Sequence, residues 1–145
     1  MKLFLPEFVR AGFWGLQNFP TVGLIDGTFR QGLEETGLGF GLEVDLIRAA
    51  RELDLLTTPY VFNPDEARAM AEAGADILIP HMGLTTKGSI GAATALTPEE
   101  SVLRIQAMHD AATGTRRDVP APGHGGPAAD PAAGRGPART PTGPA

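Results

Sequence analysis

Apolar residues follow two alternating patterns along this chain, short continuous runs and stripes at helical spacing. The clearest run, Ile77-Leu78-Ile79, comes directly after Gly74 and a short turn, Ala75-Asp76. A run of this length without alternation is typical of a strand covered on both faces of a sheet. Glycine supplies the left-handed residue that ends many helices. The pattern therefore predicts a helix, turn and strand of a parallel α/β protein.

The same alternation extends over most of the chain. One apolar stripe at helical spacing indicates a helix that lies on a sheet, and its members are Leu42, Leu46, Ala49, Ala50 and Leu53. Asn63-Pro64-Asp65-Glu66 and Thr97-Pro98-Glu99-Glu100 are start signals of two further helices, the second with a capping box. The predicted helices cover residues 5–11, 42–53, 64–73 and 98–112, and the predicted strands cover residues 13–19, 55–62 and 76–80.

Two glycine-rich stretches interrupt this order. We expect residues 20–41 to form a long packed loop with little regular structure, because glycines recur through it, among them Gly23, Gly27, Gly32, Gly37 and Gly39. Loops this long are usually functional or disordered. The acidic pair Glu34-Glu35 is then a solvated face of that loop. A second loop, rich in glycine and threonine, is expected after residue 82.

The alternation ends near residue 118, where a further strand is due. Residues 118–123 read DVPAPG, and two prolines remove two donors from a hydrogen-bond ladder, so an interior parallel strand is not expected there. The last 32 residues hold seven Gly, seven Pro and seven Ala, with Val119 as the one large aliphatic residue. The predicted organisation is an ordered part at 1–113, a degenerate strand and loop at 114–127, and a disordered tail at 128–145.

Charge and composition exclude several classes of function. Residues 1–113 carry 8 Lys and Arg against 15 Asp and Glu, and an acidic surface argues against nucleic-acid binding through phosphate contacts. The chain has no cysteine, which excludes thiolate chemistry. No segment reaches the roughly 20 apolar residues of a membrane span. We therefore expect no nucleic-acid or membrane partner, and a cytoplasmic location.

Polar residues at strand ends are the candidates for chemistry. His81 follows the strand at 76–80 at its carboxyl end, the edge where parallel α/β proteins bind ligands. It could act as a general acid or base or as a donor to a substrate oxygen; alternatively, it is bonded within the rim. Asn18 could orient a carboxylate or simply form a turn before Pro20. Asp26 could act as a base or bind a metal, although Asp-Gly is first of all a turn signal.

The loop after His81 contributes further candidates. Gly83 allows a ligand to approach the backbone closely, and Thr85, Thr86 and Lys87 offer two hydroxyls and a cation that could hold an anionic group. The alternative is an exposed loop. Nucleotide-binding motifs and the His-Glu-x-x-His and Gly-x-Ser-x-Gly motifs are missing from the sequence.

Four blocks of sequence carry a resemblance to a known family. They are GLQNFPTVGLIDG at 15–27, LEETGLGFGLEVDLIRAARELDLLTTPYVFN at 33–63, AGADILIPHMGLTTKGSIGA at 73–92 and HGGP at 124–127. Together they closely resemble the phosphoenolpyruvate hydrolase-like family of TIM-barrel proteins, also described as TIM-barrel signal-transduction proteins. The resemblance implies an α/β fold that is part of a (β/α)8 TIM barrel, lacking the first strands and the last.

The resemblance also suggests a function. It implies a protein that acts on or binds a small oxo-acid or enol-phosphate, with His81 and Asp26 as catalytic candidates and Asn18 and the loop after His81 orienting the substrate. His124, Gly125 and Gly126 would hold its anionic end. No cofactor follows from the residues; Mg²⁺ stays open, because the related superfamily uses it to stabilise an enolate.

Two alternatives remain beside this reading. One is a non-catalytic barrel that senses a metabolite or transmits a signal. The other is an inactive, truncated gene product, for which the neighbouring DNA should encode the missing strands. The expected partners are a small anionic metabolite and, if the chain folds, further copies of itself in a homo-oligomer.

Overall fold

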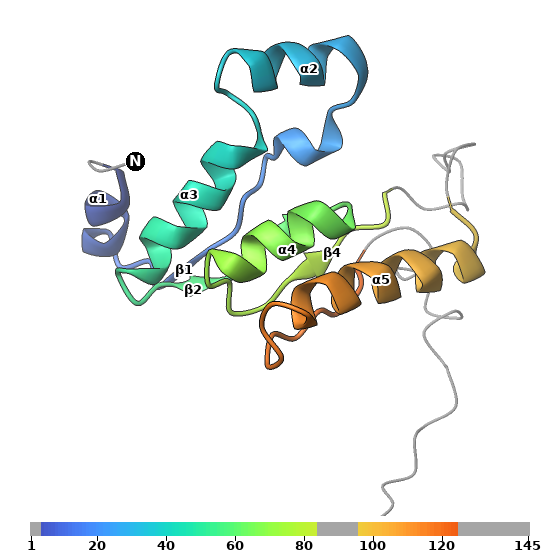
Figure 1. Ribbon diagram of the computed structural model, residues 1–145. Helices are drawn as coiled ribbons and strands as arrows, with labels where there is room; N and C mark the ends of the chain where they lie inside the picture. Colours follow the sequence, from blue (N-terminus) through green and yellow to red (C-terminus); the bar gives the residue numbers. More distant parts are fainter. Residues whose placement is uncertain (1–3, 84–95, 125–145) are drawn as a thin grey trace, which may run out of the picture.

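The computed structural model describes residues 4–83 and 96–124, which form an α/β structure of short parallel strands and helices (Figure 1). The helices are α1 (Phe4–Arg10), α2 (Gly27–Glu35), α3 (Phe40–Arg51), α4 (Pro64–Glu72) and α5 (Pro98–Thr113), with a 3₁₀ turn, η1 (Val22–Leu24). The strands are β1 (Gly15–Leu16), β2 (Leu56–Thr57), β3 (Tyr60–Val61) and β4 (Ile79–Pro80).

The strands are parallel and follow the order of the chain. β1 pairs with β2, and β3, which continues from β2 after Thr58-Pro59, pairs with β4. Within each of these two pairs, a strand thus lies beside the next one in the sequence. The predicted continuous strand at 55–62 is therefore split in two, and the strands predicted at 13–19 and 76–80 are shorter than expected.

The segment before His124 lies parallel to β4 without forming a regular strand, as predicted. The N–H of Leu78 donates to Pro120 O at 2.9 Å, and the His124 N–H donates to Pro80 O at 2.8 Å. The two rungs between these bonds would need an N–H on Pro122 and on Pro80, and proline has none. The prolines remove individual rungs, while their carbonyl groups still accept.

Buried aliphatic side chains between the strands and the helices form the core. Five of these side chains are at most 1% exposed: Ile47 of α3, Val61 of β3, Met70 of α4, Leu78 just before β4, and Met108 of α5. Figure 1 shows α4 and α5 running side by side. No helix among the described residues is long and apolar enough to cross a bilayer.

The helix start signals are confirmed. Asn63 Oδ1 accepts from the Glu66 N–H and caps α4, and Thr97 and Glu100 form the predicted capping box of α5. Gly74 has a φ of +91° and closes α4 as expected.

The prediction of an irregular loop over residues 20–41 is wrong, because η1, α2 and the start of α3 lie there. Gly27 and Gly37 have φ of +60° and +75° and stand at the two ends of α2, so they bound the helix. Pairs one turn apart stabilise its interior: Arg30 with Glu34, and Gln31 with Glu35. Glu34 and Glu35 therefore belong to a helix and not to a loop face.

The predicted apolar stripe of α3 is only partly right. Phe40, Ile47 and Ala50 are its buried residues, whereas Leu42 and Leu53 are 42% and 44% exposed. α3 starts at Phe40, two residues earlier than expected, and its buried face is rotated accordingly.

A polar network joins the amino-terminal ends of the strands. Thr57 is fully buried, and its hydroxyl donates to Asp76 Oδ2 and accepts from the Asp76 N–H, both at 3.0 Å. The backbone N–H of Thr57 donates to the same carboxylate oxygen at 2.9 Å. Arg51 donates to the other oxygen, also at 2.9 Å, so β2 and the turn before β4 share one carboxylate.

We predict that Thr57→Val destabilises the protein by about 1–3 kcal/mol, because the substitution keeps the shape but removes the buried hydroxyl that donates to the Asp76 carboxylate. The Asp76 N–H then keeps only its longer bond, to Thr57 O at 3.2 Å. Urea unfolding followed by far-UV circular dichroism measures the change. Thr28→Val, at an exposed position of α2, is the control. Equal midpoints for the two variants would contradict the prediction.

Candidate functional site

His81 lies at the carboxyl edge of the strands, where the sequence placed it. Its N–H donates to Val61 O at 2.8 Å, and it forms a parallel bridge with His124. Nδ1 of the ring accepts from the Gly83 N–H at 3.0 Å. Since a neutral imidazole carries one proton, this bond places the proton of neutral His81 on Nε2. Gly83 has a φ of +82°, which glycine adopts readily.

Aromatic side chains surround this imidazole. The centroid of its ring lies 5.0 Å from that of Tyr60, 5.3 Å from that of Phe62 and 5.5 Å from that of His124. His124 also stacks on Tyr60, with centroids 5.6 Å apart. We call Tyr60, Phe62, His81 and His124 the carboxyl-edge cluster. It brings together two of the predicted site residues, His81 and His124.

Burial within the cluster lowers the pKa of His81, and the neighbouring charge of His124 lowers it further. At neutral pH His81 is therefore an uncharged hydrogen-bond donor through Nε2.

Asn18 extends the parallel ladder with its side chain. Its Oδ1 accepts from the Tyr60 N–H at 2.6 Å, and its Nδ2 donates to Tyr60 O at 3.2 Å. Nδ2 also donates to Glu43 Oε2 at 2.5 Å. Asn18 is only 3% exposed, so its amide is occupied by protein groups directly beside the cluster.

Glu43 is the residue at this edge that the sequence pattern missed. Its Oε2 also accepts from the Thr21 hydroxyl at 2.7 Å, and its Oε1 accepts from the Val22 N–H at 2.8 Å. Glu43 is not part of the apolar stripe predicted for residues 42–53, and that stripe alone gives no partner for it. A more informative signal is its place in the first turn of α3, because in a parallel α/β unit that turn lies at the carboxyl edge.

A second buried carboxylate supports the same region from behind. Glu66 accepts from the Phe62 N–H at 2.9 Å and from Arg30 Nη2 at 3.3 Å. Burial raises the pKa of Glu66, and the Phe62 N–H and the Arg30 charge oppose that rise. Arg30 also donates to Val22 O at 2.8 Å. Arg30 thus connects α2 with α4 and with the loop that contacts Glu43.

The remaining candidates are not part of the cluster. Asp26 is exposed and precedes α2, which stands apart from the strands in Figure 1. Thr85, Thr86, Lys87, Gly125 and Gly126 lie outside the described residues.

The side chains around His81 do not suit Mg²⁺. This ion prefers carboxylate and water oxygens, whereas the cluster offers imidazole and phenol groups, and Glu43 is held by three protein donors. Within residues 4–83 and 96–124, no group of three or more His, Asp or Glu could hold a metal ion. No step is therefore assigned to Mg²⁺.

Comparison with known proteins decides the family. A model of the phosphoenolpyruvate hydrolase-like family matches residues 1–136. The chain belongs to this family. Two tomato proteins (Solanum lycopersicum), the ToMV resistance protein Tm-1(GCR237) and the ToMV susceptible protein tm-1(GCR26), are each 60% identical to it over 131 residues.

The match to the two tomato proteins covers 90% of this chain but only 17% of their length. The chain thus corresponds to a small part of these relatives. Because a resistance protein and a susceptible protein match it equally well, identity over this segment links it to neither trait.

For this member of the phosphoenolpyruvate hydrolase-like family, we predict that Glu43→Gln lowers the free energy of unfolding by about 1–3 kcal/mol. The glutamine amide replaces one acceptor oxygen by a donor that faces another N–H, which leaves buried groups unpaired. Urea unfolding is the measurement. Asp45→Asn, on the exposed side of α3, should change stability by a few tenths of a kcal/mol. A similar loss in both variants would count against the network.

We also predict that His81 makes a destabilising contribution as the pH falls below 6.5, the ordinary pKa of histidine, while the raised pKa of Glu66 acts in the opposite direction. The folded chain binds the His81 proton more weakly than the unfolded chain, so acidification favours unfolding until the lower, folded pKa is passed. Urea midpoints are compared at pH 7.5, 6.5 and 5.5. As the pH falls, the midpoint of the wild type should decrease relative to that of His81→Gln, and its difference from that of His109→Gln should stay constant. Equal slopes for all three proteins would exclude His81 as the cause.

Proposed function

We propose that the carboxyl-edge cluster binds a small oxo-acid or enol-phosphate through a hydrogen bond from His81 Nε2. The observation that supports this most directly is the bond from the Gly83 N–H to Nδ1. It fixes the neutral tautomer that donates from the other nitrogen, and carbonyl, carboxylate and phosphate oxygens all accept such a bond.

In this proposal His81 polarises an oxygen of the ligand. A donor aimed at a carbonyl or enolate oxygen stabilises negative charge that develops there, and it does so without reorganising when the site is already fixed. The same bond argues against His81 as the base. Nδ1 is occupied, and the neutral Nε2 carries the proton, so His81 would first have to give up its contact with Gly83.

Asn18 and Glu43 position the cluster in this proposal and do not contact the ligand. Asn18 holds both backbone groups of Tyr60, and Glu43 holds Asn18 together with the turn at Thr21 and Val22. A rigid supporting shell of this kind keeps the donor in place.

We further propose that the strands are part of a (β/α)8 barrel. Parallel strands in chain order, with helices between them and a histidine at their carboxyl edge, support this architecture. A barrel also gives the parallel strands a cover on both faces, which such strands generally require.

We predict that His81→Phe weakens binding of phosphoenolpyruvate or pyruvate about tenfold or more, because a hydrogen bond to a charged group is lost. Isothermal titration calorimetry measures the affinity. His81→Gln should lose less, since its amide N–H can still donate, and His109→Phe on α5 serves as the control.

The same samples distinguish catalysis from binding alone. Phosphate release from phosphoenolpyruvate supports a hydrolase, whereas binding without release favours a metabolite sensor. Unchanged affinity in His81→Phe would refute the assignment of His81 in either case.

A further inference from the structure

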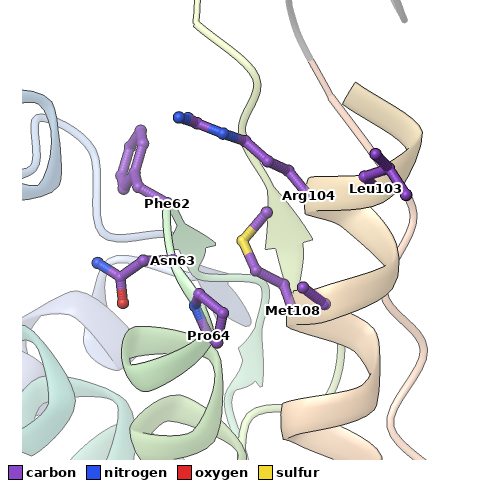
Figure 2. A pocket seen from close by; sticks show the side chains of 7 residues that line it. Phe62, Asn63, Pro64, Leu103, Arg104 and Met108 are labelled. Carbon is purple, nitrogen blue, oxygen red and sulfur yellow. The ribbon is translucent and has the colours of Figure 1, made fainter. Parts of the chain in front are cut away.

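A cavity lies beside the carboxyl-edge cluster and shares Phe62 with it. It measures about 400 Å³ and is lined by Phe62, Asn63 and Pro64 at the start of α4 and, among other residues of α5, by Arg104 and Met108. Figure 2 shows it as a gap between the two helices, with Met108 facing Pro64 across it. We call it the α4–α5 pocket. Its volume falls in the range of small-molecule sites.

The walls of the α4–α5 pocket are mainly apolar. Phe62, Pro64 and Met108 present a ring face, a pyrrolidine and a thioether, and Met108 is only 1% exposed. Such a surface gains most from a hydrocarbon group, because removing apolar area from water is favourable. The walls of the pocket therefore favour a ligand whose main part is a hydrocarbon group.

Arg104 gives the pocket a charged end. Figure 2 shows its side chain reaching from α5 toward Phe62, so that the guanidinium group lies at one end of the gap. Within residues 4–83 and 96–124 it forms no ion pair and no hydrogen bond. Glu100, one turn earlier, accepts from the Thr97 N–H at 2.8 Å through Oε2; this bond and, to a smaller extent, the charge of Arg104 lower the pKa of Glu100, but Arg104 donates no hydrogen bond to it.

Several other arginines of the described part differ in this respect. Arg48, Arg51 and Arg68 each pair with a neighbouring aspartate. A guanidinium group without such a partner, placed at the end of an apolar pocket, is complementary to a carboxylate, which it can bind through two parallel hydrogen bonds.

We propose that the α4–α5 pocket is a second ligand site, which binds an apolar carboxylate with its hydrocarbon chain against Phe62, Pro64 and Met108 and its carboxylate on Arg104. The ligand differs in class from the small polar acid proposed for the cluster.

Phe62 is shared between the two sites. Its ring lines the pocket and contacts His81, with centroids 5.3 Å apart. On its other side the ring packs against Gly23, where an added Cβ would lie 2.3 Å from two ring atoms. The ring therefore has little room to move away, and a ligand in the pocket should alter the surroundings of His81.

The test is a titration of the 145-residue chain with straight-chain carboxylates from acetate to octanoate. Each added methylene should tighten binding roughly fourfold until the pocket is filled. The NMR signal of the Met108 methyl group, assigned with Met108→Leu, should shift with the same saturation curve as the calorimetric signal. The neutral analogue 1-octanol should bind at least about tenfold more weakly than octanoate.

Variants separate the charge from the cavity. Arg104→Gln should weaken octanoate binding about tenfold or more, whereas Arg117→Gln, at an exposed position after α5, should leave it unchanged. Octanoate binding is measured in the absence of pyruvate and phosphoenolpyruvate, which keeps this result independent of the proposed function.

Three results would overturn the proposal. They are an absence of saturable binding, equal affinity for octanoate and octanol, and an Arg104→Gln affinity equal to that of the wild type.

Discussion

The structure depends on a parallel ladder that the backbone alone does not complete. Pro80 and Pro122 withhold two donors from the ladder between β4 and the segment before His124, and every strand of the described part is two residues long. Polar side chains pair further backbone groups at both edges. Asn18 continues the ladder toward Tyr60 at the carboxyl edge, while Thr57 and Asp76 close it at the amino edge. Because buried backbone groups must be paired, these side chains are as necessary to the fold as the strands themselves.

The candidate site follows from where that ladder ends. The His81 N–H makes one of the last rungs, to Val61 O, and its ring turns back onto the Gly83 N–H. One residue is thus fixed at two points, its backbone by the sheet and its imidazole by the following turn. A donor held in this way loses little freedom when a ligand arrives, which favours binding.

Short sequence signals were sufficient to predict those features whose interacting residues are close together in the chain, such as the starts of helices. The start of α4 at Pro64 and of α5 at Pro98 could be predicted because a cap and its partner lie within three residues of each other. α2 was missed because its glycines were counted without regard to position, and Gly27 and Gly37 in fact lie at its ends. The place of Glu43 in a first helical turn indicates the carboxyl edge, but its partner Asn18 could not be predicted, since it is 25 residues away and the periodicity of a helix does not identify partners outside it.

Long-range bonds also connect the outlying α2 to the site. Arg30 of α2 binds Glu66, and Glu66 holds the backbone N–H of Phe62, whose ring lies against His81. The described residues of α2 are all at least partly exposed, so its position rests on these polar contacts more than on packing. The Arg30 and Glu66 side chains are only 22% and 8% exposed, so breaking this pair would leave a largely buried carboxylate without its charge partner. A change in the Arg30–Glu66 contact would therefore reach His81 through one buried carboxylate and one aromatic ring, without passing through the core.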